Sequence, residues 1–416
     1  MAETHRRPSV ILFKAKDQRA DRDSDKLDIV AAALTSEVNF VEAGAIPRGA
    51  SLPRGVPGQV IGFEVNEYEA PIVTAALTDQ EISLLRDDPN VEAVEDDGPI
   101  WAFGRGSRTD GLNLDTGRIH IEDHEDPAEE TIPEGVYQVK ALPAWDCSRG
   151  KGIKVAVVDT GIDGTHPDLA PNYKGGISFA ADEATPADLN GHGTHCAGTI
   201  AAAINGSGVV GVAPAAHLYA VKVLNRRGSG AFSQLIAGLD WCIKNNIKVV
   251  SMSLGGSEAP KALKSICDLA WKKGLILVAA AGNSGPDPDT VEFPGKYASV
   301  IAVSALAFSL AIAPFSSRGP EVELCAPGVS VLSTLPGGTY GYKSGTSMAC
   351  PHVSGVAALA WGAHRYANNV TIRRLLAWTS DNLGMPGRDT DYGFGRVDAE
   401  QAAFELIKPP AIPGLP

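Results

Sequence analysis

The strongest constraint on the fold is a series of short apolar runs in the second part of the chain. From about residue 132, the runs KVAVV, HLYAVKVL, KVVSMSL, LILVAAA and SVIAVSA alternate with segments of helical pattern. Such runs are typical of parallel strands in a sheet that helices cover on both faces. We therefore predict an α/β domain over residues 132–406, with its functional groups at the carboxyl ends of the strands.

The first hundred residues have a different pattern. PSVILFK and GQVIGFEVNEY read as strands, with the helix-like LDIVAAALTSE between them. Thr78 and Glu81 form a capping-box pattern that opens a second helix, and VEAVEDD reads as a further strand. This order predicts a small α+β, ferredoxin-like domain over 8–103, with both helices on one face of an open sheet.

Two further segments carry little regular structure. Residues 104–131 are polar, contain glycine and become acidic, so we predict a linker there. The Pro-rich tail at 407–416 suits neither a helix nor a strand.

Composition excludes several classes of protein. The 416 residues carry 36 Lys and Arg against 49 Asp and Glu, a net charge of −13, which argues against nucleic-acid binding. Six cysteines are too few for a disulfide scaffold, and their spacing matches no zinc site. The longest apolar run, at 300–315, is shorter than the roughly 20 residues of a transmembrane helix. The beginning of the chain lacks an apolar core of signal-peptide length, so we expect a soluble protein.

Four polar side chains stand where a parallel sheet gathers its chemistry. Asp159 directly follows the run KVAVV, and Asn283 stands just after LILVAAA. His192 and Ser347 each lie in a Gly-containing turn that opens a helix of small residues. Each has an ordinary explanation alone, as a turn or helix-capping residue. Together they supply the nucleophile, base, orienting carboxylate and oxyanion donor that acyl transfer needs.

Longer motifs surround these residues. VAVVDTGIDGTHPDL, GHGTHCAGTIAA, AAAGN and GTSMACPHVSGVAALA resemble the motifs of the subtilase family of serine proteases, and the resemblance spans roughly 132–406. The chain order Asp, His, Ser is that of subtilisin. The resemblance implies Asp159 as orienting carboxylate, His192 as base and acid, Ser347 as nucleophile and Asn283 as oxyanion donor. A related subgroup with a Glu/Asp/Ser set is disfavoured, because His192 and Asn283 are both present.

The resemblance also implies a substrate-binding region. Two segments would accept a peptide between them as an added strand, and a third would form a wall of the first specificity pocket. These segments are Gly228-Ser229-Gly230, Ser253-Leu254-Gly255 and Ala280-Ala281-Gly282. Glu292 aligns with the base of that pocket. Turned inward it would favour Lys or Arg before the scissile bond; the alternative is that it faces solvent.

Residues 8–103 resemble the inhibitory propeptide of the same family. We predict self-cleavage between Phe103 and Gly104, with the propeptide then acting as an intramolecular inhibitor. Cleavage after Arg105, Arg108 or Arg118 is the alternative, and a separate ligand-binding domain is a further one. A propeptide suggests a secreted enzyme, whereas the lack of an exporting segment leaves a location inside the cell open.

The resemblance implies a structural calcium ion. Its ligands would be Asp168, Asn205 and the loop that contains Ala203, Ser207 and Val209, with Glu130 close by. Carboxylate, amide and carbonyl oxygens suit this hard cation, although a capping Asp and an Asn-Gly turn explain the same residues. Glu321 and Glu323 are candidates for a second cation site.

Two further features are unusual. Cys196 resembles the buried thiol of a thiol-sensitive branch of the family. The apolar segment 305–315 stands where the family usually has a polar loop, so it forms either an exposed patch or local core, and we expect burial.

The sequence thus predicts a self-processed serine endopeptidase that acts on proteins or peptides through an acyl-enzyme. A subtilase-like binding protein without catalysis and an esterase that uses the same triad are the alternatives. The intact set of four residues argues against the first of these.

Overall fold

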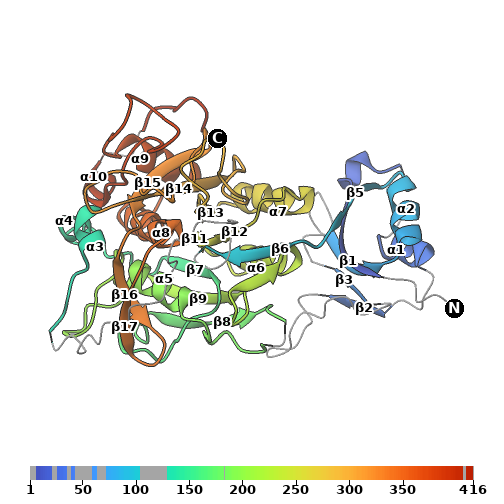
Figure 1. Ribbon diagram of the computed structural model, residues 1–416, viewed down its shortest axis with the longest axis horizontal. Helices are drawn as coiled ribbons and strands as arrows, with labels where there is room; N and C mark the ends of the chain where they lie inside the picture. The colour runs from blue at the N-terminus through green and yellow to red at the C-terminus, as the bar shows by residue number, and fades with distance from the viewer. Residues whose placement is uncertain are drawn as a thin grey trace.

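The structure is a computed structural model that describes residues 6–20, 26–34, 39–42, 59–62, 72–103, 129–181, 183–405 and 409–415. The chain forms a small N-terminal unit and a much larger second unit, joined by a strand that reaches from one to the other (Figure 1).

A seven-stranded, entirely parallel sheet forms the centre of the larger unit, which confirms the predicted α/β domain. Across the sheet, its strands are β15 (Val322–Pro327), β14 (Val300–Leu306), β13 (Ile276–Ala280), β11 (Val249–Met252), β7 (Lys154–Asp159), β9 (His217–Lys222) and β8 (Tyr173–Ser178).

Helices cover both faces of this sheet because its strands are apolar on both sides. Along β7, Val155 and Val157 pack in the cluster that contains α5 (His192–Ala201) and α8 (Thr346–Ala363). Ala156 and Val158 pack in the opposite cluster, with α6 (Phe232–Lys244) and α7 (Lys261–Lys272). Successive side chains of a strand point to opposite faces, so one apolar run supplies both cores.

Shorter elements complete the larger unit. They are α3 (Glu134–Gln138), α4 (Ala141–Ala144), α9 (Asn369–Trp378), α10 (Ala399–Phe404), and the antiparallel pair β16 (Val331–Leu335) and β17 (Thr339–Lys343).

The small unit has the predicted ferredoxin-like arrangement. Its sheet order is β2-β3-β4-β1-β5, and the apolar side chains of two helices pack together on one of its faces. The elements are β1 (Arg7–Phe13), a 3₁₀ turn (Lys16–Gln18), α1 (Lys26–Ala33), β2 (Asn39–Glu42), β3 (Gln59–Gly62), β4 (Ile72–Leu77), α2 (Asp79–Asp87) and β5 (Val91–Asp96). The capping box of α2 is present, with Thr78 Oγ1 accepting from Glu81 N and Glu81 accepting from Thr78 N.

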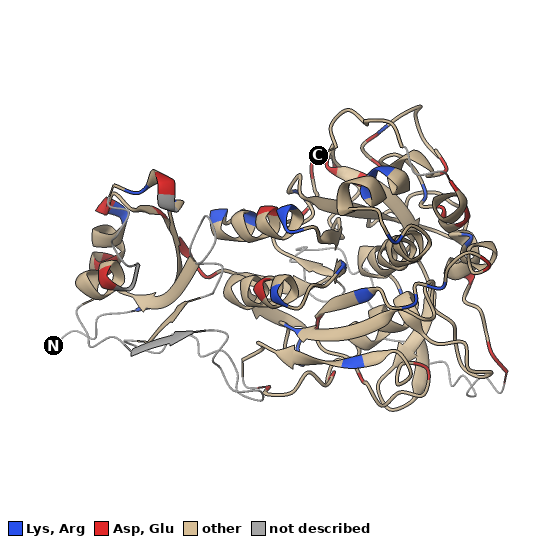
Figure 2. Cartoon of the chain, turned by 180° about the vertical axis from the view of Figure 1, so that it is seen from behind, with Lys and Arg blue, Asp and Glu red and all other residues tan. Residues whose placement is uncertain are grey.

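The other face of the small sheet packs on the larger unit. Val10 and Leu12 of β1 share a hydrophobic cluster with residues of α6 and α7, and the two units are neighbours in both ribbon views (Figures 1 and 2). Two carboxylates of the small unit bond to the beginnings of these helices. Glu95 accepts from Lys261 N and Ala262 N, and Asp97 accepts from Ser233 N and Oγ. Each carboxylate satisfies helix N–H groups that have no partner within their helix.

A strand from the small unit enters the larger one. β6 (Pro99–Ala102) pairs antiparallel with β10 (Ser229–Ala231) on one side and with β12 (Leu254–Gly255) on the other. Figure 1 shows β6 running from the small unit toward the end of the large sheet.

The sequence patterns missed parts of this architecture. β4 and β2 were not predicted. The four described residues of the run GQVIGFEVNEY form β3, and the rest of that run lies outside the described residues. Most of the predicted linker lies outside the described residues. Residues 409–415 of the tail form neither helix nor strand. Among the described helices, none combines the length and the hydropathy required to cross a bilayer.

The segment 305–315 is only partly buried, so the expectation of burial holds for its ends and not for its middle. Ala305, Leu306, Ile312 and Ala313 are buried, whereas Phe308, Ser309, Ala311 and Pro314 are exposed. Leu306 and Ile312 pack against Cys325, with Leu310 partly buried beside them. Phe308 is 71% exposed, because it lies in the turn that joins β14 to the returning chain.

The buried His352 of α8 gives the larger unit a pH-dependent stability. Its Nδ1 donates to Met348 O at 2.8 Å, and its Nε2 lies against Gly135 with no hydrogen-bond partner among the described residues. Burial lowers the pKa of His352 from 6.5 to about 4. The folded state therefore binds this proton more weakly than the unfolded state. The stability that the neutral ring supplies is complete above pH 6.5 and is lost between pH 6.5 and 4.

We predict that His352→Leu, in a Ser347→Ala background that prevents proteolysis, reduces this acid sensitivity. Urea unfolding at pH 7 and 4.5 should show the parent losing up to about 3 kcal/mol more than the variant. An equal loss in both proteins would contradict the assignment to His352.

Candidate active site

The four predicted catalytic residues lie at one end of the large sheet. Asp159 is the last residue of β7, and Asn283 follows β13. His192 is the first residue of α5, and Ser347 is the second residue of α8. Parallel strands all end at the same edge, and helices that follow such strands begin there, which explains the convergence.

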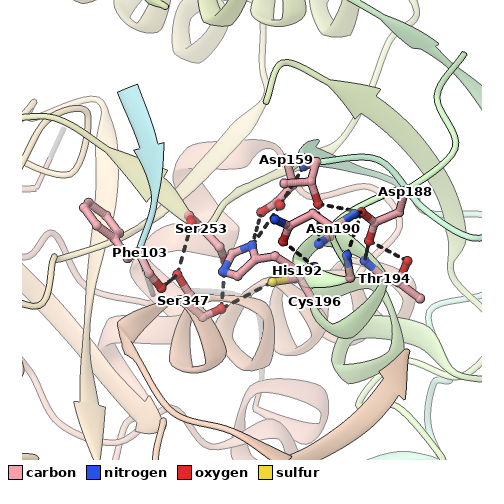
Figure 3. A network of polar contacts seen from close by, with 12 residues as sticks. Phe103, Asp159, Asp188, Asn190, His192, Thr194, Cys196, Ser253 and Ser347 are labelled. Carbon is pink, nitrogen blue, oxygen red and sulfur yellow. Dashed lines mark hydrogen bonds and ion pairs between the residues drawn. The ribbon is translucent and has the colours of Figure 1, made fainter. Parts of the chain in front are cut away.

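Asp159 and His192 form a close pair. His192 Nδ1 lies 2.8 Å and 3.0 Å from the two carboxylate oxygens of Asp159, and both side chains are buried (Figure 3). A carboxylate can only accept, so Nδ1 carries the proton and Nε2 is left as an acceptor. Nε2 has no hydrogen-bond partner in the described part of the chain. The ring is thus oriented to take a proton.

The hydroxyl of Ser347 faces the end of β6. Its Oγ donates to Phe103 O at 2.8 Å and lies 3.1 Å from Ser253 O, and it is not hydrogen-bonded to His192 Nε2 (Figure 3). A hydroxyl has one proton and turns freely. Transfer to Nε2 therefore requires rotation of the hydroxyl away from these carbonyls.

Asn283 is oriented by Thr346. Its Oδ1 accepts from Thr346 N at 3.0 Å and from Thr346 Oγ1 at 2.9 Å, so its Nδ2 must point the other way. A carbon added to Gly345 would lie 3.3 Å from Asn283 Nδ2, 3.4 Å from Phe103 O and 3.6 Å from Ser347 N. Two N–H donors and one carbonyl oxygen therefore face the same small volume.

β6 lies where the sequence places an extended substrate. Trp101 pairs with Ser229 and with Gly255, on the two predicted segments. Ala102 N donates to Gly228 O at 2.9 Å and Phe103 N donates to Ser253 O at 3.4 Å. All six predicted strand-binding positions thus border β6 or the bonds that hold it, namely Gly228, Ser229, Gly230, Ser253, Leu254 and Gly255.

Beyond β6, the Phe103 side chain is buried against a glycine. A carbon added to Gly255 would overlap the ring of Phe103, so only glycine leaves room for it. Ala281 and Gly282 follow β13, and the carboxylate of Glu292 packs over Gly282 and accepts from Ser284 Oγ at 3.1 Å. Glu292 is therefore turned toward the predicted wall, Ala280-Ala281-Gly282, rather than fully into solvent.

The residues of the predicted calcium site also come together. Asp168 is fully buried, and its two oxygens lie 2.9 Å from Asn205 Nδ2 and Val209 N. Glu130 accepts from Asn205 N and Gly206 N, at the loop that contains Ala203 and Ser207. The oxygen donors of this region fit a hard cation by type.

The second predicted cation site is wrong. Glu323 is buried and both of its oxygens are bonded to Arg373, with contacts of 2.8 Å and 2.5 Å. Glu321 lies 3.9 Å from Lys296. With its charge already balanced by Arg373, Glu323 is not a ligand for a cation.

Cys196 is fully buried one turn after His192, and its Sγ lies 3.5 Å from Ser347 O. Burial and the charge of Asp159 raise its pKa, so the thiol stays protonated. His195 does not join the catalytic set, since its Nε2 bonds to Val331 O and Gly341 O.

Sequence reasoning missed the polar residues behind Asp159 and His192. Thr160 and Asp188 are both buried there, and Thr160 Oγ1 donates to Asp188 Oδ1 at 2.9 Å. One signal in the sequence could have pointed to them. Thr160 directly follows Asp159, and Asp188 stands four residues before His192.

Comparison with known proteins agrees with this geometry. A sequence model of the subtilase family matches residues 150–395, more than half of the chain. The chain belongs to the subtilase family. It is 45% identical to subtilisin E of Bacillus subtilis (strain 168) over 79% of its own length and 80% of that protein. Subtilisin of Bacillus pumilus is 48% identical over 66% of this chain and 99% of its own.

A thermostable alkaline protease of Halalkalibacterium halodurans is 40% identical over 81% of this chain and 85% of its own. These similarities establish a subtilisin-like serine peptidase, for which proteins or peptides are the substrates.

We predict that Glu292 makes the substrate selectivity of this subtilase depend on pH. Burial raises the pKa of its carboxyl, although the hydrogen bond from Ser284 opposes the shift. Preference for Lys over Phe before the scissile bond should rise with pH as Glu292 ionises, and should be lost below its pKa. The ratio of kcat/KM for matched Lys and Phe peptides between pH 5 and 8 measures this, because any pH dependence of the catalytic step that both peptides share cancels in the ratio.

Glu292→Gln is the matched control. It should show a ratio that is independent of pH and about tenfold lower at pH 8. A ratio that is unchanged by the substitution at every pH would refute a role for Glu292 in selectivity.

Proposed function

We propose that the protein is a self-processing serine endopeptidase whose triad is Asp159, His192 and Ser347. The observation that supports this most directly is the position of Phe103. Its carbonyl oxygen lies 2.8 Å from Ser347 Oγ, beside the hydrogen-bonded pair of Asp159 and His192. The chain thus presents one of its own peptide bonds to the nucleophile.

The reaction follows from these positions. Ser347 Oγ attacks the carbonyl carbon of Phe103 while its proton passes to His192 Nε2. Asp159 accepts from Nδ1 and stabilises the imidazolium that forms. His192 then gives the proton to the departing amine, here the nitrogen of Gly104, and leaves an acyl-enzyme on Ser347. A water that loses its proton to His192 releases the acid.

Negative charge on the carbonyl oxygen would develop next to two donors. Asn283 Nδ2 and Ser347 N both face the volume beside Phe103 O. The beginning of the 18-residue helix α8 adds a favourable dipole. In subtilisin, loss of the equivalent side-chain donor costs about 10²–10³ in kcat.

We further propose that residues 8–103 form an inhibitory propeptide, that 104–131 form the linker and that 132–406 form the catalytic domain. The support is the pairing of β6 between β10 and β12, which fills the place of a substrate strand. Cleavage at Phe103–Gly104 is the simplest consequence. The alternative sites after Arg105, Arg108 and Arg118 lie outside the described residues. A precursor of this type favours action outside the cell.

We also propose a calcium site at Asp168 and Asn205. Asp168, the Asn205 side chain and the carbonyls of Ala203, Ser207 and Val209 would hold the ion, with Glu130 supporting the loop. The burial of the Asp168 carboxylate supports this, although Asn205 turns its nitrogen toward Asp168 here. Binding would need that amide to turn over, so that its oxygen faces the cation.

Wild type and Ser347→Ala, expressed side by side, test the proteolytic proposal. The wild type should shorten, and its large fragment should begin at Gly104 by N-terminal sequencing. Ser347→Ala should remain at full length and should hydrolyse neither casein nor a short ester. An active wild type that keeps its full length would contradict self-processing. Ester cleavage without casein cleavage would indicate the esterase instead.

Chelation tests the cation proposal. In the inactive Ser347→Ala chain, EDTA should lower the melting temperature by several degrees, because an ion at 100 times its Kd adds about 2.7 kcal/mol of stability. Asp168→Asn in the same background should melt lower and should not respond to EDTA or added Ca²⁺. An EDTA response of equal size in both proteins would exclude this site.

A further inference from the structure

Behind the triad lies a buried carboxylate that the proposed mechanism does not use. Asp188 is in the loop before α5 (Figure 3). It is 5% exposed and accepts five hydrogen bonds. Its Oδ1 accepts from Thr160 Oγ1, Asn190 N and Gly191 N, each at 2.9 Å. Its Oδ2 accepts from Thr194 N at 2.9 Å and from Thr194 Oγ1 at 2.7 Å.

These bonds reach both members of the Asp159–His192 pair. On one side, Asp188 holds the hydroxyl of Thr160, whose N–H donates to Asp159 Oδ1 at 2.7 Å. On the other side, Asp188 holds Thr194 N, in the first turn of the helix that begins with His192. A helix cap alone would bond only to the helix, whereas Asp188 also bonds to the residue that follows β7.

Thr160 closes the connection. Its Oγ1 donates to Asp188 and accepts from Gly193 N at 2.9 Å, next to His192. Its carbonyl accepts from the buried Lys222, which pairs with Glu183 at 2.8 Å. Every polar atom of Thr160 is therefore bonded, and a closed ring of hydrogen bonds joins Asp159, Thr160, Asp188 and the first turn of α5.

The same carboxylate acts on the substrate edge through Asn190. Asp188 fixes Asn190 N, and the Asn190 side chain accepts from His192 N at 3.2 Å and donates to Arg226 O at 2.9 Å. Arg226 stands two residues before Gly228, which bonds to β6.

We propose that Asp188 is a positioning residue, which fixes Asp159 relative to His192 through Thr160 and the first turn of α5. The proposal rests on the triad inferred above and adds a group that touches neither the substrate nor the reacting atoms. Asparagine has nearly the shape of aspartate, but its NH₂ would face donors in either orientation. Asp188→Asn therefore breaks the ring at one side.

Kinetics of the processed enzyme provide the first test. Asp188→Asn should lower kcat on a short peptide roughly ten- to hundredfold, because hydrogen bonds to a charged group are stronger than those between neutral groups. KM should change by less than about threefold, because Asp188 does not touch the substrate. Thr160→Val should lower kcat by a similar factor. Thr160→Ser, which keeps the hydroxyl, should have a kcat close to that of the wild type. The double variant Asp188→Asn/Thr160→Val should be no worse than either single variant, because both break one ring.

Asp398→Asn is the matched control for stability. Asp398 is a fully buried carboxylate that caps α10 and pairs with Lys140, away from the triad. Its substitution should lower the melting temperature and leave kcat within twofold. The proposal is wrong if Asp188→Asn also leaves kcat within twofold. It is also wrong if the losses of kcat in Asp188→Asn and Thr160→Val multiply in the double variant.

Proton NMR of the full-length Ser347→Ala chain provides a readout that does not need activity. The Nδ1 proton of His192, shared with Asp159, should resonate far downfield. Asp188→Asn should move this signal upfield or broaden it, and Asp398→Asn should leave it in place. An unchanged signal in Asp188→Asn would overturn the proposal. Full activity of His192→Ala would refute the triad itself, which is a separate outcome.

Discussion

Everything in this site depends on a sheet whose two faces are both buried. Val155 and Val157 pack on one side of β7, and Ala156 and Val158 pack on the other, so a polar group without a partner is unfavourable on either face of this strand. The carboxyl edge remains, and there the chain places Asp159, His192, Asn283 and Ser347 on separate elements. Their alignment is set by the sheet rather than by any contact between neighbours in the sequence.

The sequence predicted the elements of this edge well, for a physical reason. Apolar runs fix which segments are strands, and Asp159 or Asn283 at their ends then follow from topology. Glu323 was misjudged because a carboxylate in a sequence does not show whether Arg373, fifty residues away, neutralises it. Asp188 and Thr160 were missed because their partners come from three different elements, and no local pattern records such a ring.

The small unit was predicted in outline but not in its contacts. The capping box at Thr78 and the strand at VEAVEDD are local signals, and both formed. β4 lacks such a signal, since IVTAAL fits a helix as easily as a strand until its neighbours are known. The bonds of Glu95 and Asp97 to the beginnings of α7 and α6 are tertiary, so the sequence could not show that two carboxylates join the units.

The strand β6 is continuous with the small unit and is also paired with β10 and β12 of the larger unit, so the small unit is attached at more than one place. Severing the chain behind Phe103 removes one covalent bond but none of the contacts at Val10, Leu12, Glu95 or Asp97. The severed fragment would be held both by β6 and by the face of its sheet that packs on α6 and α7. If one of these contacts breaks, it can form again before the other dissociates. The rate at which the fragment dissociates then sets the delay between hydrolysis and the appearance of active enzyme. During that delay the protein would be fully cleaved and still inhibited.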